Sequence, residues 1–544
     1  MKINHSSRFS QILLGPLLAV LLAAAAGIGQ EAATRPRVTA SPTVTPTPSP
    51  APSTTPSPAR IQTLDELQSR IRQRLFAPEV RRGRIGVKIV SLSSGRVIFE
   101  NDSEKYFMPA SNMKNFTVAA GLERLGPDFR IITSVFSNAP PDTSGTVKGD
   151  LRVFGRGDIS ISTAFFGTSA ADPETYFKGI DRLVEKITAA GVKRVEGSIV
   201  GDESYFKGFA IPATWEWDDL QWYYGAEISA LPLNDNAVDI AVKPGSNGSP
   251  CAVAVSPSNT LMQIVNLCTT SAAGTKRSLQ VEKKLDRNNL QITGTMPADD
   301  AGFRGSVTFT RPSDLFVALL KNRLESKGVL VSGGARTLPT NVSTTGPQVE
   351  IARLESAPFS LIAAKTMKPS QNMYTETILW TLGEQARERL GTGTRQSATS
   401  AHLGIEAVKE FLGSIGIPED GIRQYDGSGL SRHNLITPSA VVTLYTHMGK
   451  QSRHAQAWRD SLTIGGVDGT LANRFKGTVA AGNMRGKTGT IDQVSALSGY
   501  VTTAGGDELV LSILVNGVAG ESRTRTRLID DIVISLANFN GKVD

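Results

Sequence analysis

Three short groups of residues combine a hydroxyl with an amine or an amide at close spacing. In the first, Ser111-Asn-Met-Lys114, a hydroxyl and an amine stand three residues apart, and this spacing brings both side chains onto one face of a helix. Burial or a neighbouring cation lowers the pKa of a lysine, which can then take the proton of a serine hydroxyl. The pattern therefore predicts that Ser111 is a nucleophile and Lys114 its base.

The same spacing occurs again at Ser204-Tyr-Phe-Lys207. The residues that follow include Gly208 and Pro212, which break a helix within about one turn, so nothing would hold these two side chains together. Ser111 instead precedes residues 116–125, a continuous run with helical periodicity. We therefore expect Ser111, and not Ser204, to be the nucleophile.

The other two groups are ambiguous when each is taken alone. Ser370-Gln-Asn372 follows a proline and precedes a helical run, so Ser370 could simply cap a helix. Lys487-Thr-Gly-Thr490 leads into a predicted hairpin and could be a polar strand edge. On an exposed strand beside a nucleophile, however, a lysine and a hydroxyl can clamp a carboxylate, and a glycine lets a substrate approach the backbone closely.

The elements that must position these groups come from both ends of the chain. Apolar residues at helical spacing predict a helix over 64–75, and β-rich runs around a Ser-Ser-Gly turn predict a hairpin over 85–100. Near the C-terminus, residues 494–515 predict a second hairpin and residues 524–539 an amphipathic helix. Together they predict one antiparallel sheet flanked by helices, with the middle of the chain as an insertion.

The insertion has two kinds of local pattern. Residues 175–191 and 314–327 have helical periodicity, and residues 197–202 have the pattern of a strand. Residues 235–300, in contrast, carry many short β-like runs and no convincing helix. We therefore expect an all-β module nested inside a mixed α/β module.

The N-terminal residues predict export. Lys2 and Arg8 precede an apolar run at 12–26 that ends in small residues, as in a secretory signal peptide. The run is shorter than the roughly 20 residues that a membrane span needs, which favours a cleaved signal peptide at 1–29 over an anchor. Residues 30–60 are rich in Pro, Thr and Ser and should form an extended linker. The mature protein is then periplasmic or otherwise extracytoplasmic, with no stable membrane span.

The composition excludes several classes of protein. The chain has 544 residues, of which 40% are apolar and 20% charged, as in a soluble protein of two to four domains. Its formal charge of +8 is spread along the chain, and no zinc-type Cys/His spacing, P-loop or nucleic-acid module is present. The sequence implies no metal, no cofactor and no nucleic-acid partner, and it leaves the oligomeric state open.

The two cysteines, Cys251 and Cys268, both lie in the middle of the chain. In an oxidising compartment they could close a loop worth about 3 kcal/mol, or they could remain two buried free thiols. We favour the disulfide, and neither alternative makes them catalytic.

The order Ser-x-x-Lys, Ser-x-Asn, Lys-Thr-Gly is the active-site set of penicillin-recognising serine enzymes. From about residue 62 to its end, the chain resembles class C low-molecular-mass penicillin-binding proteins, the D-alanyl-D-alanine carboxypeptidase/endopeptidase family of the penicillin-binding protein 4 type. Further matching stretches are Phe107-Met-Pro-Ala-Ser-Asn-Met-Lys114, Trp217-Asp-Asp-Leu-Gln-Trp-Tyr-Tyr-Gly-Ala226 and Asp426-Gly-Ser-Gly-Leu-Ser-Arg-His-Asn-Leu435.

The resemblance implies an α/β (α+β) fold with a penicillin-binding transpeptidase/β-lactamase-like domain and two nested inserted domains. The catalytic domain would comprise residues 61–126 and 346–544. Residues 127–234 and 302–345 would form the inserted α/β domain, and residues 235–301 the nested all-β domain.

The resemblance also implies a role in catalysis for each matching residue. Ser111 attacks the carbonyl of the penultimate D-Ala, and Lys114 takes its proton. Ser370 relays a proton to the leaving D-Ala with help from Lys487. The backbone N–H groups of Ser111 and Thr490 form the oxyanion hole.

Other matching residues would bind the substrate. Asn372 hydrogen-bonds its backbone, Thr488 together with Lys487 holds its terminal carboxylate, and Gly489 lets it approach the strand closely. Asp219 and Arg432 match an Asp and an Arg that help relatives bind the side chain of the diamino acid. Alternatively, they are a helix-capping Asp and a structural loop Arg.

The function implied is that of a serine D-Ala-D-Ala carboxypeptidase/endopeptidase. It would act on peptidoglycan stem peptides through an acyl-enzyme on Ser111, and β-lactams such as penicillin would acylate it. A β-lactamase shares the three groups but not so large an insertion, and a non-enzymatic β-lactam sensor or wall-binding module would not need all three intact. A Ser-His-Asp hydrolase lacks support because no Gly-x-Ser-x-Gly elbow is present, and His433 is expected to be structural.

Overall fold

The computed structural model describes residues 60–167, 172–338, 348–390 and 397–544. The predicted signal peptide and all of the predicted linker except Arg60 lie outside these residues. Within the described ranges, no helix has the length and apolar character needed to cross a bilayer.

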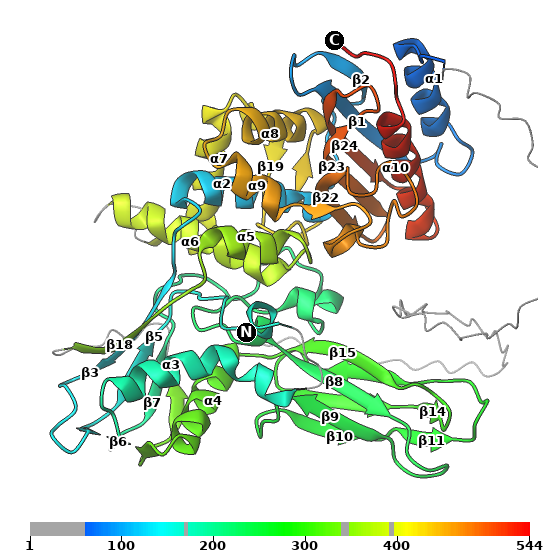
Figure 1. Cartoon of the computed structure of the whole chain (residues 1–544). Coiled ribbons are helices and arrows are strands. Elements are labelled where there is room, and N and C mark those ends of the chain that lie inside the picture. The colour runs from blue at the N-terminus through cyan, green and yellow to red at the C-terminus, as the bar shows by residue number, and fades with distance from the viewer. Residues whose placement is uncertain (1–59, 168–171, 339–347, 391–396) are drawn as a thin grey trace, which may run out of the picture. The chain divides into compact units, whose positions relative to one another are not determined.

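A six-stranded antiparallel sheet joins the two ends of this part of the chain, in the order β2-β1-β24-β23-β22-β21 (Figure 1). Strand β1 pairs with β24 along its whole length, so a strand near the N-terminus lies against one near the C-terminus. This confirms the sheet predicted from the two hairpins. The strands are β1 (Arg84–Ser91), β2 (Val97–Asn101), β21 (Thr463–Ile464), β22 (Arg485–Ile491), β23 (Val494–Thr502) and β24 (Glu508–Asn516).

Both faces of this sheet are covered. In β24, Leu509, Leu511 and Ile513 belong to the hydrophobic cluster with α1 (Leu64–Leu75) and α10 (Ser522–Ala537). The alternate residues Val510 and Leu514 belong to a second cluster, on the opposite face, because successive side chains of a strand point to opposite faces. Figure 1 shows α1 and α10 together on one side of the sheet.

The second cluster contains the two helices that begin at Lys114 and Asn372, the last residues of the Ser-x-x-Lys and Ser-x-Asn groups. Helix α2 lies at its centre, and every residue from Lys114 to Leu122 is buried. A helix that is buried all round must be surrounded by other elements, which are mostly helices here. The helices of this layer are α2 (Lys114–Leu125), α5 (Phe359–Met367), α6 (Asn372–Leu390), α7 (Ser400–Ser414), α8 (Pro438–Lys450) and α9 (Ala455–Ser461).

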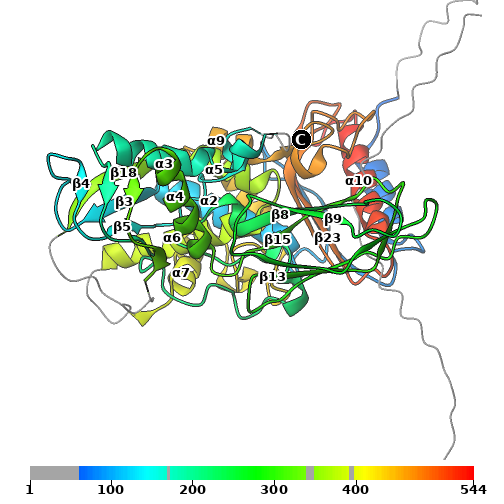
Figure 2. The same cartoon turned by 90° about the horizontal axis from the view of Figure 1, so that it is seen from below.

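The middle of the chain first forms a mixed α/β part. Its five-stranded sheet has the order β17-β7-β5-β3-β18 and packs against α3 and α4 (Figure 1, Figure 2). A small sheet, β16-β6-β4, adjoins it. The elements are β3 (Ile132–Ser137), β4 (Thr146–Val147), β5 (Leu151–Phe154), α3 (Lys178–Ala189), β6 (Arg194–Val195), β7 (Ile199–Asp202), α4 (Pro312–Ser326), β16 (Leu330–Val331), β17 (Ala335–Thr337) and β18 (Val349–Glu355).

A strand-rich part follows between β7 and α4. It contains the sheets β15-β8-β9, β10-β13-β12 and β11-β14, and a disulfide joins Cys251 to Cys268 within it. Strand β15 lies beyond residue 301 yet pairs with β8. We therefore propose that the strand-rich module extends through β15, and we keep the other boundaries predicted above as the divisions of the insertion. The strands are β8 (Ala237–Lys243), β9 (Ala252–Ser256), β10 (Gln263–Asn266), β11 (Thr269–Ser271), β12 (Gln280–Lys283), β13 (Asn289–Thr293), β14 (Thr295–Pro297) and β15 (Phe303–Thr308).

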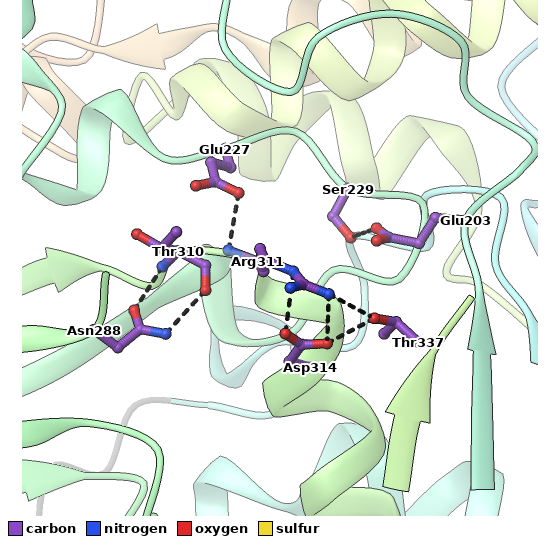
Figure 3. A network of polar contacts seen from close by, with 8 residues as sticks. All are labelled: Glu203, Glu227, Ser229, Asn288, Thr310, Arg311, Asp314 and Thr337. Carbon is purple, nitrogen blue, oxygen red and sulfur yellow. Dashed lines mark hydrogen bonds and ion pairs between the residues drawn. The ribbon is translucent and has the colours of Figure 1, made fainter. Parts of the chain in front are cut away.

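A polar network ties these two parts together at the start of α4 (Figure 3). The backbone N–H of Arg311 donates to Glu227 at 2.9 Å, and its guanidinium donates to Thr337 at 3.1 Å. Beside it, Asn288 and Thr310 exchange two hydrogen bonds of 2.9 and 2.8 Å. The network fixes the chain around Glu227, which ends the segment described next.

The segment 216–227 is attached to the strand-rich part through β15. Thr308 donates its N–H to the carbonyl of Gln221 at 3.0 Å and its hydroxyl to the carbonyl of Leu220 at 2.8 Å. The insertion therefore holds this segment in place, and the segment in turn reaches the catalytic side chains.

Candidate active site

The nucleophile candidate lies in a turn that leads directly into α2. Ser111 is part of a 3-10 helix, Ala110–Met113, and Lys114 begins the α-helix. Because a 3-10 helix has three residues per turn, residues i and i+3 stand directly above one another. The Lys114 Nζ donates to the Ser111 Oγ at 2.9 Å. Ala110 has φ +46°, which is strain of the kind that clusters at functional sites.

Lys114 is fully buried and makes two further hydrogen bonds. Its Nζ donates to Asn372 Oδ1 at 2.5 Å and to the backbone carbonyl of Ser428 at 2.7 Å. Burial lowers the pKa of Lys114 to about 7, although the nearby carboxylates Asp426 and Glu376 counteract it. A large fraction of Lys114 is thus neutral near pH 7 and can accept the proton of Ser111.

Ser370 and Lys487 form a second hydroxyl–amine pair. The Lys487 Nζ donates to the Ser370 Oγ at 2.8 Å, and burial followed by the charge of Lys114 holds the pKa of Lys487 well below its usual range. Ser370 has φ +67°. Gln371, rather than Ser370, accepts the N–H of Met373 at the start of α6, at 3.1 Å. The Ser370 hydroxyl therefore binds the Lys487 amine and does not cap α6.

Strand β22 brings the third group beside the nucleophile. A Cβ on Gly489 would lie 2.6 Å from the carbonyl oxygen of Pro109 and 3.1 Å from the N of Ser111. Only glycine permits this approach of the strand to the turn. Before Gly489, the hydroxyl of Thr488 donates to the hydroxyl of Thr470 at 2.7 Å. After Gly489, Thr490 is exposed.

The loop that follows Asp426 lies against the nucleophile turn from another direction. Gly429 has φ +85°, and a Cβ there would lie 1.8 Å from the carbonyl oxygen of Ala110. The loop is held by the buried Asp426 carboxylate. This carboxylate accepts hydrogen bonds of 2.7 to 2.9 Å from Gly429 N, Ser431 N, Asn434 Nδ2 and Trp215 Nε1. The sequence did not identify the Ser428 carbonyl as a partner of Lys114.

Arg432 and Asp219 lie close enough for their charges to interact. The Arg432 Nε pairs with Glu216 at 2.8 Å, and its Nη1 donates to the carbonyl of Asp492 at 3.0 Å, just beyond β22. Asp219 ends a short 3-10 helix that starts after Glu216. Burial, then the charges of Asp218 and Glu216, raise the pKa of Asp219 to about 6. Sequence reasoning missed Glu216, which has no motif to identify it.

The insertion reaches the catalytic residues through Tyr224. Its backbone carbonyl accepts the Nδ2 of Asn372 at 2.9 Å. Because the Oδ1 of Asn372 binds Lys114, both ends of this amide are oriented. The segment 216–227 thus forms part of the wall around the predicted site.

The second Ser-x-x-Lys pattern, Ser204 to Lys207, and His433 make contacts that are structural. Residues 204–207 contain no helix, and the backbone N–H of Lys207 donates to Ser400 at 2.7 Å. His433 packs edge-on against Tyr425, with ring centroids 5.3 Å apart.

The chain is similar in sequence to known proteins. The model of the D-Ala-D-Ala carboxypeptidase 3 (S13) family matches residues 67–538. A D-alanyl-D-alanine carboxypeptidase of Actinomadura sp. (strain R39) is 33% identical over 88% of this chain and 86% of its own. The penicillin-sensitive carboxypeptidase A of Dictyostelium discoideum is 27% identical over 81% and 84%.

The fold is also found among solved structures. Penicillin binding protein 4 (dacB) from Haemophilus influenzae superposes with a TM-score of 0.71 and 22% identity, covering 89% of this chain and 100% of that one. Its complex with a β-lactam gives a TM-score of 0.66, also at 22% identity, over 88% and 98%. This likeness confirms the predicted fold class.

Proposed function

Because this chain belongs to the D-Ala-D-Ala carboxypeptidase 3 (S13) family and is a D-Ala-D-Ala carboxypeptidase, we propose that it works through an acyl-enzyme on Ser111. One observation carries the proposal: the buried Lys114 amine lies 2.9 Å from the Ser111 hydroxyl and has a pKa lowered to about 7. The substrates are stem peptides of peptidoglycan, and the chain reaches them outside the cytoplasm after removal of residues 1–29.

The first half of the reaction forms the ester. Lys114 takes the proton of Ser111 while the Oγ attacks the carbonyl carbon of the penultimate D-Ala. The N–H groups of Ser111 and Thr490 stabilise the resulting oxyanion. The C–N bond then breaks, and the proton that Lys114 took passes through Ser370, whose hydroxyl is bonded to Lys487 at 2.8 Å, to the leaving D-Ala amine. In the second half, water attacks the ester carbonyl, one of its protons returns through Lys114 to the Ser111 oxygen as the C–O bond breaks, and the shortened peptide leaves as a carboxylic acid.

The substrate is held from several directions. Thr488 and Lys487 bind the terminal carboxylate, and Gly489 lets the peptide lie close to β22. Asn372 donates the remaining hydrogen of its Nδ2 to the substrate backbone, since the other Nδ2 hydrogen binds Tyr224.

The same chemistry supports endopeptidase action, because only the leaving amine differs. We expect the purified mature protein to release D-Ala from a D-Ala-D-Ala pentapeptide and to split a cross-linked stem-peptide dimer. Mass spectrometry of the products measures both reactions. Failure to release D-Ala would overturn the proposed function, whereas an uncut dimer would overturn only the endopeptidase part.

Penicillin should act as a slow substrate of the same serine. We expect a stoichiometric adduct that decays slowly, because opening of the β-lactam ring leaves the amine attached to the acyl group, where it hinders attack by water on the ester. A β-lactamase would instead hydrolyse the adduct quickly, and stopped-flow measurement of penicillin turnover separates these two cases.

We also propose that Asp219 binds the free amine of the diamino acid. Since the pKa of Asp219 is raised to about 6, its charge is present above this pH and lost below it. The KM for an amine-bearing peptide should therefore fall by about 5-fold from pH 5 to pH 7.5, a modest effect because the carboxylate is half-exposed.

Two controls isolate this effect from the titration of Lys114. A peptide whose side-chain amine is acetylated should show no such fall in KM, and neither should Asp219→Asn with the free amine. An unchanged pH dependence of KM in Asp219→Asn would contradict the assignment.

A further inference from the structure

A buried carboxylate that the reaction scheme does not use lies next to Lys114. Glu376 stands one helical turn after Asn372 in α6 and is 1% exposed, so both side chains project from the same face of the helix. Its Oε1 accepts the backbone N–H groups of Ser428 at 2.7 Å and Gly427 at 3.0 Å. Its Oε2 accepts the Gly427 N–H as well, at 3.0 Å.

The turn that Glu376 holds carries one of the acceptors of Lys114. The Ser428 carbonyl accepts the Lys114 Nζ at 2.7 Å. The neighbouring carbonyl, that of Gly427, accepts the hydroxyl of Thr117 in α2 at 2.9 Å. The turn is thus fixed through its N–H groups by α6 and through its carbonyls by α2.

The position of the Ser428 carbonyl decides where the base points. A neutral lysine amine has two hydrogens and one lone pair, arranged tetrahedrally around nitrogen. Asn372 Oδ1 and the Ser428 carbonyl accept two hydrogens of Lys114. The lone pair is then left for the third neighbour, the Ser111 Oγ at 2.9 Å, as proton abstraction requires.

We propose that Glu376 is a positioning residue of this reaction, which holds the Gly427–Ser428 turn so that the Ser428 carbonyl directs the lone pair of Lys114 at Ser111. The inference rests on the proposed function, because it requires Lys114 to be the base. Glu376 acts only through the turn and through Lys114, so it is not a catalytic residue.

The charges around Lys114 supply a signature that a purely structural role would not have. The charged groups that face it are Glu376 from α6, Asp426 from the loop and Lys487 from β22. Burial and the neighbouring Asp426 raise the pKa of Glu376 to about 8 despite its hydrogen bonds to the turn, so the carboxylate is only partly charged near pH 7. Glu376 and Asp426 both favour the ammonium form of Lys114. Loss of Glu376 therefore lowers the pKa of Lys114.

The experiment measures the rate constant for acylation by penicillin as a function of pH in three variants. Glu376→Ala removes the acceptor of the Gly427 and Ser428 N–H groups and should slow acylation about 10²-fold, the cost of misplacing a catalytic group by about 1 Å. The acid limb of its pH–rate profile, where the rate rises as Lys114 loses its proton, should move to lower pH by about half a unit. Glu376→Gln keeps one oxygen for both N–H groups, so its rate should stay within about threefold of wild type, with the limb shifted in the same direction.

Glu384→Ala is the matched control. Glu384 is another buried carboxylate of α6, and it binds Arg387 at 2.8 Å and the hydroxyl of Ser400. Its removal should lower thermal stability without moving the acid limb.

Each outcome decides the question. Unchanged acid limbs in both Glu376 variants, or a Glu376→Gln variant as slow as Glu376→Ala, would overturn the inference. If Glu376→Ala does not fold, the limb of Glu376→Gln decides alone. A wild-type protein that forms no adduct would overturn the proposed function instead, so the two failures are distinguishable.

Discussion

Ser111→Ala is expected to reduce the release of D-Ala from a D-Ala-D-Ala peptide by about 10⁴-fold or more. Without the Oγ no ester can form, and only binding and the oxyanion hole remain to assist direct attack by water. The substitution removes one oxygen beside a turn that stays held by β22 and by the loop at Gly429. Fold and substrate binding should therefore persist.

Single-turnover kinetics with saturating peptide measure this loss. Ser204→Ala is the matched control, because Ser204 belongs to the same Ser-x-x-Lys pattern but lies where the chain forms no helix. It should retain the wild-type rate. A Ser111→Ala variant that keeps more than about one per cent of the rate would contradict nucleophilic catalysis at this residue.

Lys114→Met should slow acylation by penicillin about 10³-fold. The methionine keeps an unbranched apolar chain in the buried site but cannot accept a proton, and a positioned general base contributes about 10²–10⁴-fold. In the wild type, acylation should rise with pH through about 7 as Lys114 loses its proton. This limb should be absent from the residual rate of Lys114→Met.

The control for Lys114 is Lys207→Met, which changes the lysine of the second Ser-x-x-Lys pattern. It should acylate as the wild type does. Lys487→Met tests the rival base, since Lys487 is the other buried amine of the site and binds Ser370. Rapid acylation of Lys114→Met together with its loss in Lys487→Met would reverse the roles of the two lysines.

The sequence predicted the parts of the site that depend on local spacing. Ser111 and Lys114 are three residues apart, and any helical turn brings them together. The sheet was predictable because each hairpin shows as two β-rich runs around a short glycine-containing turn, and such runs need a shared sheet to bury their apolar side chains. The sequence pattern did not specify that Ser111 lies in a 3-10 turn ahead of α2, since both helix types suit the same residues.

Contacts made by the backbone could not be predicted. The Ser428 carbonyl binds Lys114 across 314 positions of sequence, and every residue offers a carbonyl, so no side-chain pattern marks this one. Glu376 did leave a signal, because it is an acidic residue inside an otherwise mostly uncharged helical run, one turn after Asn372. A carboxylate among the buried residues of a helix indicates that it has a partner.

The partner of Arg432 was unpredictable for a different reason. Its contact with Glu216 joins the loop after Asp426 to the insertion, and the position of the segment 216–227 depends on contacts such as those of Thr308 with Gln221 and Leu220. These contacts depend on how several modules pack, which no local sequence pattern specifies.

The most direct test is to locate the penicillin adduct on the mature protein. Intact mass should show one penicilloyl group per chain, and fragmentation of the proteolysed adduct should place it on Ser111, in the peptide that also contains Lys114. An adduct on Ser204 or Ser370, or a correctly folded protein that forms none, would contradict the proposed acyl-enzyme on Ser111.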